Sequence, residues 1–134
     1  MAGNRPQFGP KPVFNSDTGQ DMSGDITGLV SIVQDIIKVG YGISWRGTAP
    51  VGILNVQVSN DYSVNSQGDV LNAGTWNTMP FDLNGTTVSD LPVSGDNGNG
   101  FIEIDVTAAY AMRLIYTATS GVGTINAIAT GKGF

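Results

Sequence analysis

Apolar and polar residues alternate along much of this chain, which is the period-two pattern of β-strands with one buried face. The clearest run covers residues 37–46, where the apolar positions are Ile37, Val39, Tyr41, Ile43 and Trp45, and the positions between them are Lys38, Gly40, Gly42, Ser44 and Arg46. The same alternation predicts a strand with outward-facing acids over residues 102–106 and another strand over residues 110–117. These segments predict a sheet that buries one of its faces.

Residues 26–33 differ because their apolar residues fall on both parities. This pattern predicts a strand that is covered on both sides. A helix over residues 28–39 is the competing interpretation. The strand is favoured by the β-branched residues of this stretch, which are Val30, Ile32, Val33, Ile36, Ile37 and Val39.

The middle of the chain predicts strands divided by turns. A turn is expected at residues 47–50, followed by a strand that runs to Val58 with a bulge near Ile53. Residues 59–74 are polar and rich in turn formers, and short edge or crossover strands are expected at residues 75–81 and 86–93.

Near the C-terminus, the Asn and Gly residues of the stretch 96–100 predict a chain reversal, and a last strand is expected at residues 122–129. About eight strands at this spacing predict an all-β fold, a single antiparallel β-sandwich or jelly roll. We assign it to residues 25–134.

Residues 1–24 predict an extended, non-helical N-terminal arm, because three prolines fall within the first twelve residues. The first twelve residues carry two cations and no acid. We expect an assembly arm whose apolar residues dock in a groove of a neighbouring subunit while its cations meet acidic patches; its residues are Arg5, Phe8, Lys11, Val13 and Phe14. A floppy leader is the alternative.

Composition narrows the function. The 134 residues are 40% hydrophobic and 13% charged, which fits one domain, and the net charge of −5 argues against binding of nucleic acid. The absence of Cys and His excludes disulfide scaffolds, thiol nucleophiles and Ser-His-Asp triads. No apolar run approaches the ~18 residues of a membrane span.

Carboxylates offer little chemistry. Residues 97–102 imitate the middle of an EF-hand, but with Gly100 at the sixth position the first and twelfth positions are Gly95 and Val106, so a hairpin turn is favoured over calcium. Calcium held between loops by Asp61, Asp69 or Asp96 stays open, and no other cofactor is implied. Glu103 and Asp105 share a strand face, which is typical of an outer surface more than of a glycosidase pair. No enzyme is expected.

Arg113 is expected to pair with one of these two acids, Glu103 or Asp105, or to anchor a partner.

Aromatic residues suggest a second class of function. The parity of Tyr41, Trp45, Tyr110 and Tyr116 predicts core packing. Tyr62 and Trp76 lie in turn-rich sequence and could form a platform on which sugars stack. The candidate ligand residues in and beside the loops at 59–74 and 94–100 are Tyr62, Asp69, Trp76, Asp96, Asn97 and Asn99.

Three stretches carry a family resemblance: ISWRGTAPVGILNVQVSND at residues 43–61, GTWNTMPF at residues 74–81, and YAMRLIYTATSGVGTIN at residues 110–126. Together they resemble small β-sandwich proteins of bacteriophage virions and similar viral particles, over about residues 37–130. The pattern is also similar to discoidin-type and galactose-binding jelly rolls. The resemblance implies a structural role and transfers no catalytic residue.

The leading hypothesis is therefore a virion structural protein, namely a minor capsid, cement or decoration, vertex or tail-associated subunit. It would assemble in the host cytoplasm with copies of itself and other virion proteins, through its arm and its sheet edges. The alternative is a carbohydrate- or receptor-binding module at a spike or fibre tip, with a host glycan as the partner.

Overall fold

The computed structural model of the chain describes residues 6–14, 19–83, 85–106 and 108–133. These residues form strands, turns and bends, with no helix among them. Consequently, the described part contains no helix that is long and apolar enough to cross a membrane. The strands are β1 (Gln7–Pro12), β2 (Gln20–Asp21), β3 (Ile26–Thr27), β4 (Ser31–Ile32), β5 (Lys38–Ser59), β6 (Ser63–Val64), β7 (Val70–Asn72), β8 (Asn77–Met79), β9 (Phe81–Leu83), β10 (Thr86–Val88), β11 (Leu91–Val93), β12 (Asn97–Asp105) and β13 (Ala111–Lys132).

Two long strands organise the fold. β5 and β13 each contain 22 residues and pair antiparallel almost from end to end. Both strands bend where their register shifts, and there Ala49 and Gly121 have φ angles of +48° and +80°. A side chain on Gly121 would collide with the carbonyl oxygen of Ala49, so this bend requires glycine.

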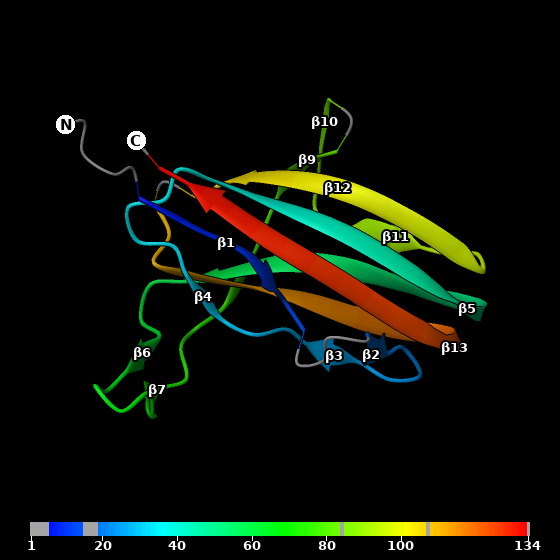
Figure 1. Cartoon of the computed structure of the whole chain (residues 1–134), viewed down its shortest axis with the longest axis horizontal. Coiled ribbons are helices and arrows are strands. Elements are labelled where there is room, and N and C mark those ends of the chain that lie inside the picture. Colours follow the sequence, from blue (N-terminus) through cyan, green and yellow to red (C-terminus); the bar gives the residue numbers. More distant parts are fainter. Residues whose placement is uncertain (1–5, 15–18, 84, 107, 134) are drawn as a thin grey trace.

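The bend folds the pair into two layers that face each other (Figure 1). We call the first layer the sheet built on residues 38–47 and 123–132, with β1, β2 and β12 alongside. The second layer is built on residues 51–59 and 111–118, with β3, β4, β8 and β11 alongside. The expected all-β antiparallel sandwich is confirmed.

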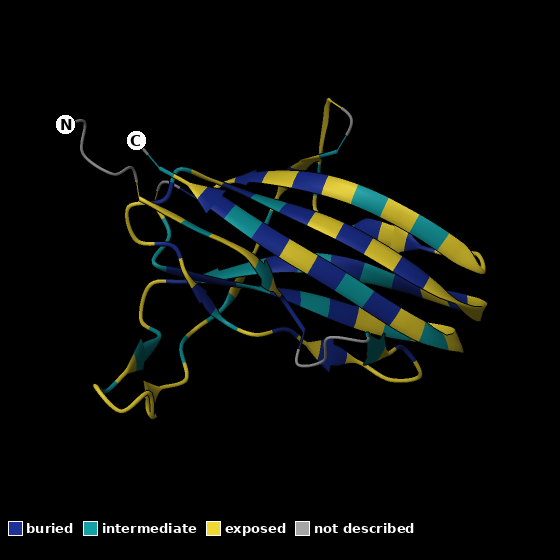
Figure 2. Ribbon diagram, in the orientation of Figure 1, coloured by how far each residue is buried: buried dark blue, intermediate teal, exposed yellow. Residues whose placement is uncertain are grey.

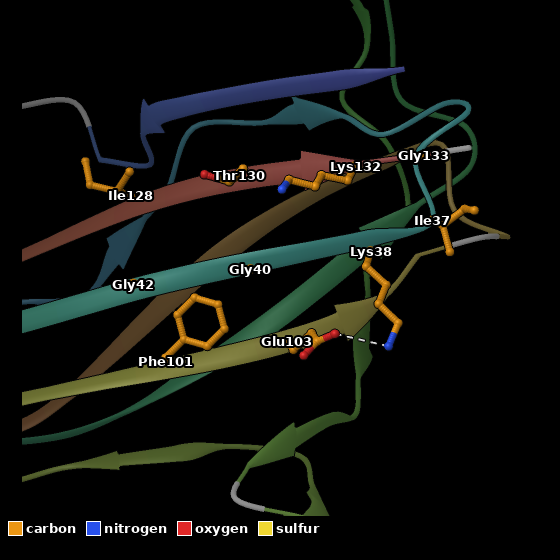
Figure 3. Close-up of a pocket in the computed structure, with 10 residues that line it drawn as sticks. All are labelled: Ile37, Lys38, Gly40, Gly42, Phe101, Glu103, Ile128, Thr130, Lys132 and Gly133. Carbon is orange, nitrogen blue, oxygen red and sulfur yellow. Dashed lines mark ion pairs between the residues drawn. The ribbon is translucent and has the colours of Figure 1, made fainter. Parts of the chain in front are cut away.

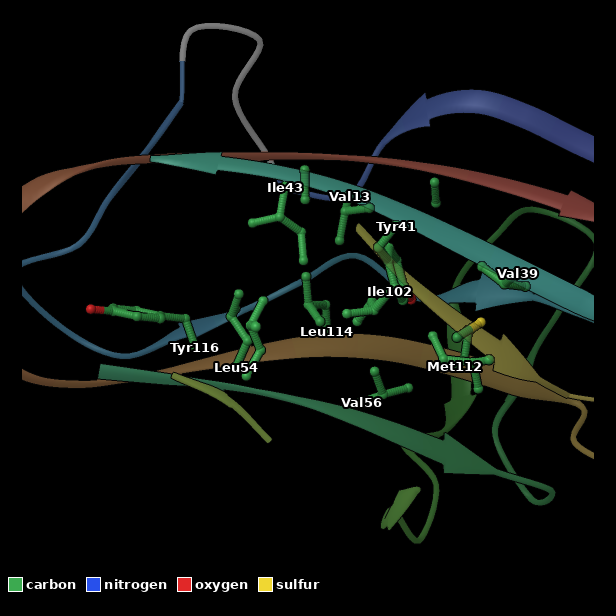
Figure 4. Close-up of a cluster of buried hydrophobic side chains, with 14 of the residues drawn as sticks. Val13, Val39, Tyr41, Ile43, Leu54, Val56, Ile102, Met112, Leu114 and Tyr116 are labelled. Carbon is green, nitrogen blue, oxygen red and sulfur yellow. The ribbon is translucent and has the colours of Figure 1, made fainter. Parts of the chain in front are cut away.

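The core lies between the layers, and burial alternates along the long strands (Figure 2). Side chains of the first layer meet those of the second (Figure 4); they include Val39, Tyr41, Ile43 and Ile102 above, and Leu54, Val56, Met112, Leu114 and Tyr116 below. Within the described residues, two buried polar atoms have no hydrogen-bond partner, Nε1 of Trp45 and Oη of Tyr116. Both aromatic residues therefore serve the core, as their parity predicts.

Several local expectations are corrected. The stretch 47–50 is a bend inside β5 and not a turn between strands, and the register shifts of the pairing with β13 face residues 48–52, next to the bulge expected near Ile53. Residues 97–100 belong to β12, because the chain reverses earlier, at residues 94–96, where Gly95 has a φ of +87°. No helix forms over residues 28–39, which hold β4 and the start of β5.

The N-terminal segment packs on its own chain. β1 pairs with β13, the ring of Phe8 covers Gly131, and the amide of Val13 donates to the carbonyl of Ala127 at 2.9 Å. Val13 and Phe14 are 3% and 2% exposed and belong to the core. The expectation that they dock on a neighbour is therefore wrong, because both side chains pack in the core of their own chain.

The structure describes one of the two cations of this segment, Lys11, but not the other, Arg5. Lys11 places its Nζ 4.6 Å from the centre of the Phe8 ring, and partial burial lowers the pKa of its ammonium. Its charge is thus engaged within the chain. Arg5 lies outside the described residues.

Candidate binding groove on the first layer

The outward face of the first layer is hollowed along its central strand. Register places the outward side chains of β13, β5 and β12 in rows across the sheet. The rows are Asn126–Ser44–Asn99, then Ile128–Gly42–Phe101, then Thr130–Gly40–Glu103, and finally Lys132–Lys38–Asp105. Because β5 contributes glycine to both middle rows, the sheet has a low floor there, between side chains on either side.

This depression is an open groove with a volume of about 780 Å³ (Figure 3). Its apolar walls are Phe101 of β12 and Ile128 of β13, which are 64% and 44% exposed. A hollow of about 290 Å³ continues it past Gly42 to Ser44 and Asn126. A further hollow of about 410 Å³ extends from there to Trp45 and Arg46. The groove therefore follows β5 for most of the length of the first layer.

The two floor glycines differ in what surrounds them. A Cβ on Gly40 would lie 2.7 Å from Cζ of Phe101, so the ring of Phe101 leans over this position. A Cβ on Gly42 would meet no atom within 4 Å. Gly40 thus accommodates the aromatic wall, whereas the space above Gly42 is empty.

One end of the groove is charged. Lys38 Nζ lies 3.0 Å from Glu103 Oε1, and this carboxylate raises the pKa of the lysine (Figure 3). Lys132 stands beside Lys38 on the neighbouring strand. The ion pair is exposed, so it orders two side chains at the groove's rim more than it stabilises the fold.

The other end carries neutral hydrogen-bonding groups. Ser44, Asn99 and Asn126 form one row across three strands. Within the described part of the chain, none of their side-chain atoms takes part in a hydrogen bond. Their hydroxyl and amide groups are available to a ligand.

The structure also brings together Tyr62 and Trp76, the aromatic pair that the sequence singled out. Their ring centres are 5.8 Å apart, at an interplanar angle of 57°. The guanidinium of Arg113 lies 4.1 Å from the centre of the Trp76 ring, and its Nε donates to Oε1 of Gln57 at 2.8 Å. The indole N–H of Trp76 donates to the carbonyl of Ala73 at 2.8 Å. One face and the polar edge of this indole are therefore used inside the chain.

Asp61 fastens the same region. Its carboxylate accepts bonds from the Thr75 amide at 2.6 Å, the Thr75 hydroxyl at 2.9 Å and the Ser59 hydroxyl at 2.8 Å. These bonds, the Thr75 amide foremost, lower the pKa of Asp61. The carboxylate closes the excursion of residues 61–75 onto the end of β5.

The remaining candidate ligands are dispersed. Asp69 is hydrogen-bonded to Asn65 within the turn between β6 and β7. Asp96 accepts a hydrogen bond from the Ala49 amide at 2.8 Å and so braces the bend in the middle of β5, whereas Asp61 lies just after the last residue of β5. Asn97 and Asn99 lie on β12 and not in a loop. The described residues hold no group of three or more acidic side chains that could bind a metal.

The expectation that Arg113 pairs with Glu103 or Asp105 is likewise corrected. It contacts Gln57 and Trp76 on the second layer, whereas Glu103 pairs with Lys38 on the first. Glu103 and Asp105 do share the outward face of β12, as their spacing predicts. The sequence pattern placed Gly40, Gly42 and Ser44 on the outward parity but did not mark them as a site. The available signal was two glycines, two residues apart, in the middle of a strong strand.

Comparison with known proteins gives a fold and no family. No protein-family model matches this chain, and no curated protein matches its sequence. The crystal structure of the SPBc2 prophage-derived protein YomS is similar, with a TM-score of 0.55 and 12% sequence identity. The similarity covers 95% of this chain and 93% of that chain. At this identity it shows a shared all-β fold.

Proposed function

We propose that this chain is a structural subunit of a bacteriophage particle, acting as a minor capsid, cement, vertex or tail-associated protein. The observation that carries the proposal is the similarity to a prophage-derived protein over nearly the whole of both chains. The sequence stretches that resemble virion β-sandwich proteins support the same assignment. No catalytic function is proposed.

A free strand edge supplies a means of assembly. Beyond β5, β12 pairs with β9 at a single position, Glu103 with Asp82. Over residues 97–102 its other edge has no strand partner among the described residues. Such an edge can accept a strand from a neighbouring subunit. The edge strand β1 is less suited to this, because Pro10 and Pro12 lack an amide N–H.

The test is localisation in the particle. Particles from a lysate of the phage or induced prophage that encodes this sequence are purified on a density gradient and probed with antibody to the recombinant chain. We expect the chain to co-sediment with particles after a high-salt wash, at a constant ratio to the major capsid protein. A host cytoplasmic protein is the negative control. A chain found only in the soluble fraction would contradict the proposal.

Recognition of a host glycan is the second candidate function. The open groove on the first layer favours it, because an exposed aromatic wall and unused amide and hydroxyl groups lie within one depression. The two functions are compatible, since particle subunits can present binding surfaces.

A further inference from the structure

We propose that the groove over Gly40 and Gly42 is a binding site for an extended glycan chain, with a sugar ring stacked on Phe101 above the glycine floor. This inference rests on the second candidate function and assigns its site. It does not require the chain to be a particle subunit. It also moves the glycan site away from Tyr62 and Trp76, where the sequence alone would place it.

Gly42 lies in the floor of the groove with open space above it. Glycine in the interior of a strand is less stable than a residue with a side chain, so it is retained where backbone geometry or close approach requires it. Gly42 does not have a positive φ angle, and a Cβ there would meet nothing within 4 Å. By contrast, the ring of Trp45 lies against the strand glycine Gly98 and would collide with a Cβ there. A ligand that lies against the backbone accounts for an otherwise unneeded glycine at position 42.

The groove is lined by both apolar and hydrogen-bonding groups. Phe101 offers a flat apolar surface, and the neutral groups of Ser44, Asn99 and Asn126 follow directly along the groove. Thr130 and the Lys38–Glu103 pair supply donors and acceptors on the other side of Phe101. Sugars present both an apolar ring face and a rim of hydroxyls that donate and accept. An aromatic wall flanked by hydroxyl, amide and carboxylate groups matches both features.

The shape indicates a chain rather than a single ring. With neighbouring strands about 4.8 Å apart, β12 and β13 stand about 10 Å apart across β5. The three hollows share residues, Gly42 between the first two, and Ser44 and Asn126 between the second and third. They form one course along β5, which suits an extended oligosaccharide.

Two other occupants fit less well. A second copy related by a two-fold axis would set this depression against itself and leave it unfilled. A peptide needs partners for its backbone groups, but the main chain of a central strand such as β5 is already paired on both sides. The groups in the groove that are available for hydrogen bonds are the side chains of Ser44, Asn99 and Asn126. Such hydroxyl and amide groups suit the recognition of sugar hydroxyls.

The experiment uses the full chain and three variants on an array of bacterial capsular, O-antigen and teichoic-acid oligosaccharides, followed by calorimetric titration of any that are retained. Gly42→Val fills the floor at a position where an added Cβ meets no atom within 4 Å, and Phe101→Ala removes the aromatic wall. Val122→Ala is the matched control, because Val122 is 54% exposed but lies at the bend of β13, away from the groove. Thermal melts verify that each variant is folded.

We expect the wild-type chain and Val122→Ala to bind the same oligosaccharide with equal affinity. Gly42→Val and Phe101→Ala should each bind at least tenfold more weakly, with a melting temperature for Gly42→Val equal to or above that of the wild type. No retention on the array, or retention that Gly42→Val leaves intact, overturns the inference. A wild-type dimer in light scattering that Gly42→Val dissociates, without glycan binding, overturns it in favour of self-association. Localisation in particles is measured separately, so either proposal can fail without the other.

Discussion

The same two strands present two different outer faces. On the second layer, residues 51–59 of β5 and 111–118 of β13 are covered by the chain's own excursions: Arg113 lies under Trp76, and the side-chain amide of Asn55 donates to the carbonyl of Ser89 at 2.9 Å. On the first layer, the corresponding halves carry glycines, exposed Phe101 and Ile128, and an open groove. Polar groups are engaged on one face and available on the other.

This difference between the two layers indicates which face has polar groups left to bind a ligand. Most buried or covered polar groups in proteins are hydrogen-bonded, so a face that the chain covers has few groups left for a ligand. Tyr62 and Trp76 look suitable in sequence, yet Trp76 is held by Ala73 and Arg113. Ser44, Asn99 and Asn126 are ordinary in sequence, yet they border an empty groove. The uncovered face is therefore the candidate interface.

Two phenylalanines give the largest expected contrast. Phe14, 2% exposed, fills the core, so Phe14→Ala should lower the free energy of unfolding by about 3–5 kcal/mol. Phe101, 64% exposed, lines the groove, so Phe101→Ala should change it by less than about 0.5 kcal/mol. Urea unfolding followed by circular dichroism measures both. Equal losses would show that the groove wall is part of the core.

Arg113 tests how firmly the second layer is covered. Arg113→Ala removes the hydrogen bond to Gln57 and the contact with Trp76, and should cost about 1–2 kcal/mol in the free energy of unfolding. Arg113→Lys keeps the charge but loses the planar guanidinium, so its free energy of unfolding should lie between those of the wild type and Arg113→Ala. Tryptophan fluorescence should report greater solvent exposure in the alanine variant. An unchanged spectrum and stability would mean that Trp76 is held without Arg113.

Asp61 gives the smallest effect, a pH dependence. Hydrogen bonds from Thr75 and Ser59 hold its pKa below the usual 3.8. Because the pKa is depressed in the folded state, its contribution is fully present above pH 3.8 and is lost as the pH falls through the folded value. The protection factor of the Thr75 amide against hydrogen exchange, taken relative to the unstructured rate at each pH, should fall over that range.

The control for this effect is Asp61→Asn, which removes the titrating group. Its Thr75 amide should have a lower protection factor than the wild type at neutral pH, and that factor should no longer fall with acid. If the wild type and the variant respond alike to acid, the excursion of residues 61–75 is held by other contacts.

The sequence predicted the sandwich well because period-two alternation reports burial directly. It placed Tyr41, Trp45 and Tyr116 inside and the acids of β12 outside, as observed. It divided β5 at residues 47–50, because Gly, Ala and Pro signal a turn locally, whereas pairing with β13 keeps the strand continuous through the bend. It assigned Val13 and Phe14 to a neighbour, since the sequence gives no sign that they would close their own core.

The groove could not be predicted from sequence, because it depends on register between strands far apart in the chain. Gly42 meets Ile128 on one side and Phe101 on the other only once β13 and β12 have paired with β5. Alternation predicts which residues face outward but not which of them become neighbours. The same reason explains why Arg113 was expected near Glu103, although the two lie on different layers.

The most direct test of the account is to map a bound oligosaccharide by amide chemical shifts on the uniformly ¹⁵N-labelled chain. The account predicts that the largest changes fall on Gly40, Gly42, Phe101 and Ile128 of the first layer, while Tyr62, Trp76 and Arg113 of the second layer stay unchanged. Changes centred on Tyr62 and Trp76, with Gly40 and Gly42 unaffected, would contradict it and place recognition on the covered face.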